Sequence, residues 1–146
     1  MDGREFFKVA ERLKERSSEA EFRSAVSRAY YGAFILACQL QRSWGFNVPV
    51  GPQAHGVVRN RLQACDQPEI SDVSQAGSKL GDLHSRRLDA DYLRKENVGE
   101  KKTATRWVEV ARDIITQLEG CESDPKKTKV ILAIKTYEDK IKPPSR

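Results

Sequence analysis

The chain has 146 residues, of which 26 are lysine or arginine and 21 are aspartate or glutamate, so its formal net charge is +5. Hydrophobic residues make up 38% and charged residues 32%, which excludes an intrinsically disordered chain. No apolar run approaches the ~20 residues of a membrane span, and the charged N-terminus lacks the apolar core of a signal peptide. We therefore expect a soluble, cytoplasmic protein of one domain, or of one domain with a tail.

Three cysteines and two histidines limit the chemistry that the chain can carry. Cys38, Cys65 and Cys121 are odd in number and lack metal-ligand spacing. Neither histidine has a nearby set of metal-ligating residues, and the chain has no glycine-rich phosphate loop. We therefore expect buried thiols in a reducing compartment, no metal and no cofactor.

Hydrophobic periodicity predicts two helices in the N-terminal part of the chain. Residues 2–16 place their apolar side chains on one stripe. Ser18 and Glu21 have the spacing of a capping box, so a second helix should begin near Ser18 and run to about Trp44. Over residues 29–38 this helix is apolar nearly all round, which is typical of a central helix packed on several sides.

Three further helices follow the loop at residues 45–52. The first covers residues 53–65 and ends at Asp66-Gln67-Pro68. Ser71 and Asp72 are predicted to cap the next, whose apolar stripe runs to Ala90. The last covers residues 103–119, after a charged loop at 93–102, and Gly120 is its predicted C-terminal stop.

The C-terminal segment has two possible structures. Asp124-Pro125 has the pattern of an N-cap followed by proline in the first turn, and the apolar spacing from Val130 to Ile141 fits a helix. The run from Thr128 to Ile134 is also β-prone. We favour the helix, with a strand as the alternative. The sequence predicts an all-α bundle of about five helices over residues 1–120 and a basic C-terminal extension at 121–146.

Residues 22–65 concentrate the positive charge, because they contain five arginines and no acidic residue. These are Arg23, Arg28, Arg42, Arg59 and Arg61. The carboxylates lie elsewhere in the chain, so we expect part of this charge to be used inside the bundle. A structural ion pair between Arg28 and Asp91 is the first candidate.

The most informative segment covers residues 81–92. On a helix, His84, Arg87 and Asp91 share one face, and Arg87 falls in register with the apolar stripe. Either Arg87 or Arg86 binds a phosphate through its planar guanidinium, or Arg87 pairs with Asp91 one turn on. We favour the ion pair. His84, and still more His55, is more often a packed or hydrogen-bonded residue than a catalyst.

Three segments resemble the HEPN family (higher eukaryotes and prokaryotes nucleotide-binding). Ser27-Arg-Ala-Tyr-Tyr-Gly-Ala-Phe34 is similar to the family signature SRAYYAAF, and His55-Gly-Val-Val-Arg59 is similar to its H-x-x-V element. Arg87-Leu-Asp-Ala-Asp-Tyr92 is similar to its R-x-x-ADY element. The resemblance covers about residues 5–120. It implies a bundle of four or five helices that commonly dimerises.

The resemblance also implies an activity. Many HEPN proteins are metal-independent endoribonucleases, often toxins or defence proteins paired with a small nucleotidyltransferase. Their active sites use Arg-x4-6-His, brought together across the dimer. The histidine would assist attack of a ribose 2′-hydroxyl, and the arginine would stabilise the phosphate charge.

The chain departs from the family at the histidine of this motif. With four residues between, Arg87 is followed by Tyr92 and Arg86 by Asp91, and His84 is the last histidine. Tyrosine titrates near ~10 and aspartate near ~4, so neither readily replaces an imidazole. The leading hypothesis is a HEPN-fold binding or assembly module without the ribonuclease motif. It would form a homodimer and act with RNA, a nucleotide or a nucleotidyltransferase-type partner, in a prokaryotic defence or toxin–antitoxin setting.

Two alternatives remain. The chain could be a divergent metal-independent endoribonuclease toxin that uses Arg87 with His84 or Tyr92, or a purely structural dimeric adaptor. In the hypotheses that involve RNA or a nucleotide, the predicted phosphate contacts are Arg86, Arg87, Arg94 and Lys95.

Overall fold

Six α-helices make up most of the chain in the computed structural model, which describes residues 2–93 and 96–142. They are α1 (Gly3–Leu13), α2 (Glu19–Ser43), α3 (Gln53–Gln63), α4 (Ser71–Asp91), α5 (Lys101–Glu119) and α6 (Lys126–Ile141). Three short 3-10 turns, η1 (Pro68–Ile70), η2 (Glu96–Gly99) and η3 (Gly120–Glu122), complete the order. The described residues contain no strand, so the predicted all-α fold and the preference for a helical C-terminal segment are confirmed.

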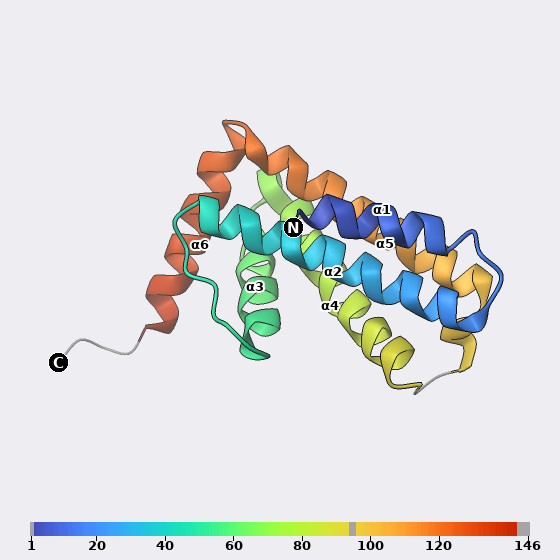
Figure 1. Cartoon of the computed structure of the whole chain (residues 1–146). Helices are drawn as coiled ribbons and strands as arrows, with labels where there is room; N and C mark the ends of the chain where they lie inside the picture. The colour runs from blue at the N-terminus through green and yellow to red at the C-terminus, as the bar shows by residue number, and fades with distance from the viewer. Residues whose placement is uncertain (1, 94–95, 143–146) are drawn as a thin grey trace.

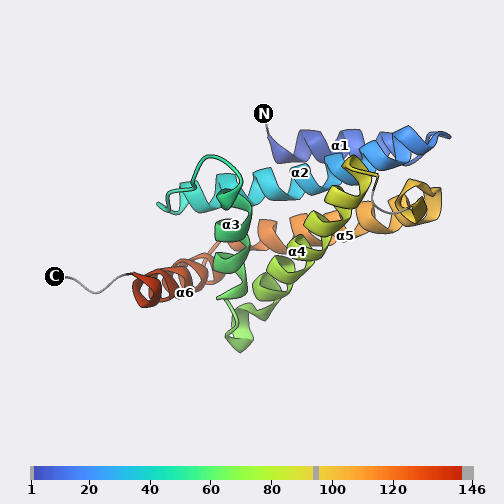
Figure 2. The ribbon, with the colours of Figure 1, turned by 90° about the horizontal axis from the view of Figure 1, so that it is seen from below.

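The long helix α2 is the centre of the bundle. Figures 1 and 2 show α1 and α5 running along it, α4 crossing it, and α3 and α6 near its C-terminal end. The predicted capping box starts it, because the Ser18 hydroxyl accepts the Glu21 amide at 3.2 Å and donates to the Glu21 carboxylate at 2.7 Å. Against α1 the approach is tight: a Cβ on Gly32 would lie 2.9 Å from the Phe7 nitrogen. Glycine at position 32 therefore allows the two backbones to meet.

The C-terminal helix α6 packs into the same hydrophobic core as the bundle. Val130, Ala133 and Ile134 lie on one face and are buried. Two ion pairs hold it at its ends, Lys126 with Asp72 of α4 and Glu138 with Arg61 of α3. Residues 126–141 are thus packed against the bundle by both apolar and charged contacts.

Two of the predicted helix starts differ from the structure. Ser71 and Asp72 do not cap α4, because the 3-10 turn η1 leads directly into the helix and Asp72 pairs instead with Lys126. The predicted loop at 93–102 is shorter, since α5 begins at Lys101. The N-cap of α6 is Pro125 and not the predicted Asp124, although the Asp124 carboxylate does accept the backbone N–H of Thr128 at 3.0 Å.

The arginines of residues 22–65 have other interaction partners than the sequence predicts. The expected Arg28–Asp91 pair does not form: Arg28 is exposed, with its guanidinium 5.6 Å from the Phe6 ring centroid. Arg23, five residues earlier, is buried instead. It donates to the carbonyls of Asp89 and Ala90 at 3.1 and 3.4 Å. The last carbonyls of a helix lack partners within that helix, so a guanidinium facing the end of α4 satisfies them.

No helix within residues 2–93 or 96–142 combines the length and apolar character needed to cross a membrane.

Candidate functional site

Four rings from three helices stack where α2, α3 and α4 meet. Tyr30 and Phe34 lie four residues apart on α2, which places them on one face. The ring centroid of Phe34 lies 4.4 Å from that of His55 on α3, and the His55 centroid lies 4.7 Å from that of His84 on α4. The Tyr30 ring contacts both imidazoles, at 5.6 and 5.0 Å. The fold therefore brings the only two histidines of the chain together.

Burial separates this cluster into a floor and a rim. Tyr30 is 1% exposed and Phe34 is 9% exposed, whereas both imidazoles are half-buried. The Tyr30 hydroxyl shares a hydrogen bond of 2.5 Å with Nδ1 of His55. This bond fixes the orientation of the ring, so Nε2 is the nitrogen that can meet a ligand.

Two arginines border the imidazoles. Arg87 lies 5.0 Å from the Tyr31 ring centroid, and its Nε is 2.8 Å from the Asp91 carboxylate. This is the predicted i,i+4 ion pair, and it is confirmed. Arg59 of α3 crosses to α4, since a Cβ on Gly81 would lie 3.0 Å from the Arg59 Cδ. Gly81 is one turn before His84, so the charge of Arg59 lies near the second imidazole.

The electrostatics of the site keep both histidines uncharged near neutral pH. Burial lowers the pKa of His55 below its ordinary 6.5, and Arg87 adds to the effect. Burial also lowers the pKa of His84, helped by His55, Arg87 and Arg59. Burial raises the pKa of Tyr30, so its phenol keeps its proton. The imidazoles are therefore neutral and able to accept a proton at pH 7.

This arrangement offers three chemical functions in one place. A neutral imidazole can accept a proton, a second imidazole can donate one, and the guanidinium groups can stabilise negative charge. Asp91 is the carboxylate paired with Arg87, whereas the hydrogen-bond partner of Arg59 among the described residues is the amide oxygen of Asn60, at 3.5 Å. The site thus suits an anionic group that gains or loses a proton. Within the described ranges no three His, Cys, Asp or Glu side chains gather as metal ligands.

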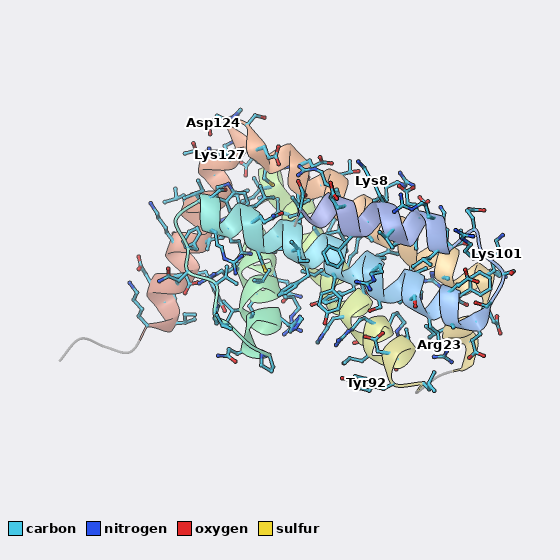
Figure 3. All side chains as sticks on the ribbon, viewed as in Figure 1. Lys8, Arg23, Tyr92, Lys101, Asp124 and Lys127 are labelled. Carbon is cyan, nitrogen blue, oxygen red and sulfur yellow. The ribbon has the colours of Figure 1, made fainter. Side chains whose placement is uncertain are left out.

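Only part of the predicted site comes together. His84 and Arg87 lie in the cluster, whereas Tyr92 lies at the C-terminal end of α4 and is 63% exposed (Figure 3). Eight residues separate Tyr92 from His84, which is about 12 Å along a helix. Arg86 faces α5 instead, with its guanidinium 5.8 Å from the Trp107 ring centroid. Arg94 and Lys95 lie outside the described residues.

Three residues of the site were not predicted as functional. The sequence predicts a weaker functional role for His55 than for His84, and it assigns no role in the site to Tyr30 or Arg59. The sequence does carry a signal for His55 and Arg59. They are four residues apart at the start of a predicted helix, and therefore lie on one face of it. The meeting of His55 with His84 depends on how α3 packs against α4, which periodicity alone does not determine.

The chain matches no protein-family model, no curated protein and no solved structure.

Proposed function

We propose that the chain is a metal-independent ribonuclease that cleaves RNA by attack of the ribose 2′-hydroxyl on the adjacent phosphate. The observation that carries the proposal is the stacked pair of half-buried imidazoles, His55 and His84, beside Arg87 and Arg59. This favours the endoribonuclease hypothesis over the binding module. The Arg-x4-6-His motif is still missing, but His55 supplies a second imidazole from another helix.

The HEPN resemblance supports the same site, because all three of its segments contribute to it. The SRAYY segment provides Tyr30 and Tyr31, and the H-x-x-V segment provides His55 and Arg59. The R-x-x-ADY segment provides Arg87, which lies over Tyr31. Residues from separate parts of the sequence that resemble the family pattern thus lie in one cluster.

The surroundings of the two histidines suggest different roles. In the proposed step, neutral His84 accepts the proton of the 2′-hydroxyl as its oxygen attacks phosphorus. The bond from phosphorus to the 5′-oxygen breaks, and the His55 imidazolium donates its proton to that oxygen. The products are a 2′,3′-cyclic phosphate and a 5′-hydroxyl. Arg59 lowers the pKa of His84 in addition to Arg87, which suits His84 as the base.

His55 suits the acid, because the phenolic oxygen of Tyr30 can accept a hydrogen bond from Nδ1–H when the ring is protonated. A bound phosphate beside the ring raises the pKa of the imidazole and so favours its charged form. Arg87 and Arg59 would hold the phosphate oxygens as charge builds up on them.

Cleavage of a single-stranded RNA in the presence of EDTA tests the proposal. We expect His55→Gln, His84→Gln and Arg87→Ala each to lower the cleavage rate by about 100-fold or more. Arg28→Ala is the matched control, since this exposed arginine lies on α2 over Phe6, and it should cleave like the wild type. An RNA with 2′-deoxyribose at the cleaved position should not react.

A substrate with sulfur in place of the 5′-bridging oxygen distinguishes the role of the acid from the role of the base. Thiolate leaves without a proton, so this substrate should restore cleavage in His55→Gln but not in His84→Gln. Cleavage that survives both substitutions would contradict the proposal. RNA binding without any cleavage would instead favour the binding module.

We also propose that the protein works in the cytoplasm. Cys38, Cys65 and Cys121 are buried free thiols, and burial raises the pKa of each. Cysteines that remain unpaired are usual in a reducing compartment.

A further inference from the structure

Two side chains that the proposed reaction does not use meet beside Arg87. Ser27 of α2 donates from its hydroxyl to the Asp91 carboxylate of α4 at 3.3 Å. The same carboxylate oxygen, Oδ2, lies 2.8 Å from Nε of Arg87. The ring centroid of Tyr31, one turn after Ser27, lies 5.0 Å from the Arg87 guanidinium. Two i,i+4 pairs, one on each helix, therefore face each other where α4 crosses α2 (Figure 2).

Two buried arginines elsewhere in the bundle show how a structural arginine is held. Arg23 and Arg61 each pair through Nε with a carboxylate, that of Glu19 and that of Glu138. Nη1 of Arg23 then donates to two backbone carbonyls, and Nη1 of Arg61 donates to a backbone carbonyl and to a side-chain amide. Nε of Arg87 is paired in the same way, but its terminal amino groups donate no hydrogen bond to the described residues. Its side chain is 17% exposed, so these amino groups remain for a ligand.

We propose that Asp91 and Ser27 are positioning residues of the ribonuclease site, which hold Arg87 by Nε and leave both terminal amino groups to the phosphate. The inference rests on the proposed ribonuclease function. A guanidinium binds two phosphate oxygens at once when its plane and its direction are fixed. The Tyr31 ring fixes the plane, and the Asp91 carboxylate fixes the direction because it faces the buried Nε. Ser27 orients this carboxylate from α2.

The charge of Asp91 supports orientation as its role. A carboxylate next to a phosphate site weakens the attraction of that site for an anion. Asp91 therefore does not help the site through its charge, whereas its oxygen supplies an acceptor for Nε of Arg87. An asparagine at this position would keep an oxygen acceptor and remove the opposing charge. We therefore expect Asp91→Asn to retain kcat and to lower KM for RNA.

Cleavage kinetics of Asp91→Ala and Asp91→Asn test the inference, because both variants lose the same charge and only the asparagine keeps the acceptor. We expect Asp91→Ala to lower kcat by about 20-fold, and Asp91→Asn by no more than about threefold. Ser27→Ala should lower kcat by about threefold, whereas Ser24→Ala, at an exposed serine one turn earlier on α2, should not change it. Adding Asp91→Ala to Arg87→Ala should cause no further loss, because Asp91 acts through Arg87.

Proton NMR titration of the imidazoles gives a readout that needs no cleavage. Arg87 lowers the pKa of both His55 and His84. If Asp91 holds Arg87 in place, both titration midpoints should be higher in Asp91→Ala than in Asp91→Asn. This difference should disappear in the Arg87→Ala background. Urea unfolding of each variant establishes that it folds, and the comparison of Ser27→Ala with Ser24→Ala replaces that of the Asp91 variants if Asp91→Ala does not fold.

The outcomes separate this inference from the proposed function. Equal kcat values and equal midpoints in the two Asp91 variants would overturn the inference and leave the ribonuclease in place. A further loss of cleavage on adding Asp91→Ala to Arg87→Ala would also overturn it, because Asp91 would then act independently of the arginine. A wild type that cleaves no RNA, together with midpoints that move as expected, would contradict the ribonuclease and support the positioning of Arg87 by Asp91.

Discussion

Arginines at the α1–α5 edge and arginines at the histidine site have opposite surroundings. Arg4 of α1 lies 3.0 Å from both Glu119 and Glu122, and Arg112 of α5 pairs with Glu11 and Glu109. Arg4 also lies 3.5 Å from Asp2, so it meets three carboxylates and Arg112 meets two. At the histidine site, Asp91 is the one carboxylate that pairs with Arg87, and the hydrogen-bond partner of Arg59 within the described residues is an uncharged amide oxygen.

This difference changes what the positive charge does to its neighbours. Hydrogen bonding to Glu11 raises the pKa of Arg112, so the charge is held by its partners. Arg87 and Arg59 instead act on imidazoles, whose pKa values they lower. Comparing the two regions therefore separates arginines that stabilise the fold from arginines whose charge remains available to a ligand.

The largest predicted effect concerns a buried arginine with a full set of partners. Arg61 pairs with Glu138 and donates to the Asn47 carbonyl at 2.7 Å and to the Gln41 side chain at 3.2 Å. We expect Arg61→Ala to lower the free energy of unfolding by about 3 kcal/mol, because these groups lose their partner inside the protein. Urea unfolding measures the loss.

Arg59→Ala is the matched control, two residues earlier on the same helix. It should change the free energy of unfolding by no more than about 0.5 kcal/mol, because Arg59 has no carboxylate partner among the described residues. Equal losses in the two variants would remove the distinction between structural and available arginines.

The second effect concerns the hydrogen bond at the floor of the site. Tyr30→Phe keeps the ring stack but removes the hydroxyl that meets Nδ1 of His55. We expect a loss of about 1 kcal/mol in the free energy of unfolding, since His55 is left half-buried without this partner. Tyr31→Phe, next in the chain, should stay within about 0.5 kcal/mol of the wild type. A Tyr30→Phe variant as stable as the wild type would show that the bond contributes little to the fold.

Most of the fold could be predicted because it depends on local signals. The capping box at Ser18 and Glu21, the glycine after α5 and the helical spacing of apolar residues each act within a few residues. The cap predicted at Ser71 and Asp72 was wrong because the 3-10 turn η1 leads directly into α4, and because Asp72 pairs with Lys126, which lies 54 residues further on.

The site was harder to predict because its contacts cross between helices. The pair Arg87–Asp91 lies within α4 and was foreseen, whereas the pair Arg28–Asp91 had to cross to α2 and does not form. His55 and His84 are 29 residues apart and meet only because α3 packs on α4. Helical periodicity reports which side of a helix is buried, but not which neighbour buries it.

The third effect is a pH dependence of the two imidazoles. Their pKa values lie below 6.5 in the folded chain, so the unfolded chain binds these protons more readily. We therefore expect the two imidazoles to leave the free energy of unfolding unchanged above about pH 6.5. As the pH is lowered from there, their protonation in the unfolded chain should reduce it. His55→Gln and His84→Gln should each reduce this fall. Urea unfolding between pH 7.5 and 5.5 measures it.

Proton NMR titration of the two imidazoles tests whether Arg87 and Arg59 lower their pKa values. Arg87→Ala should raise the titration midpoints of both rings, because Arg87 lowers the pKa of each. Arg59→Ala should raise the midpoint of His84 more than that of His55, since Arg59 contributes to the lowered pKa of His84. If Arg59→Ala moved neither ring, Arg59 would not belong to the site.

The smallest effect is expected at the α1–α5 edge, although this region has the most ion pairs per arginine. Arg112→Ala should lower the free energy of unfolding by about 0.5 kcal/mol, because its side chain and both carboxylates are well exposed and solvent screens the pairs. Raising the salt concentration should reduce the difference further. The comparison of Arg112→Ala with Arg61→Ala by urea unfolding at low and high salt measures this. A loss as large as that of Arg61→Ala would mean that the number of carboxylate partners, rather than burial, decides how much an arginine stabilises this fold.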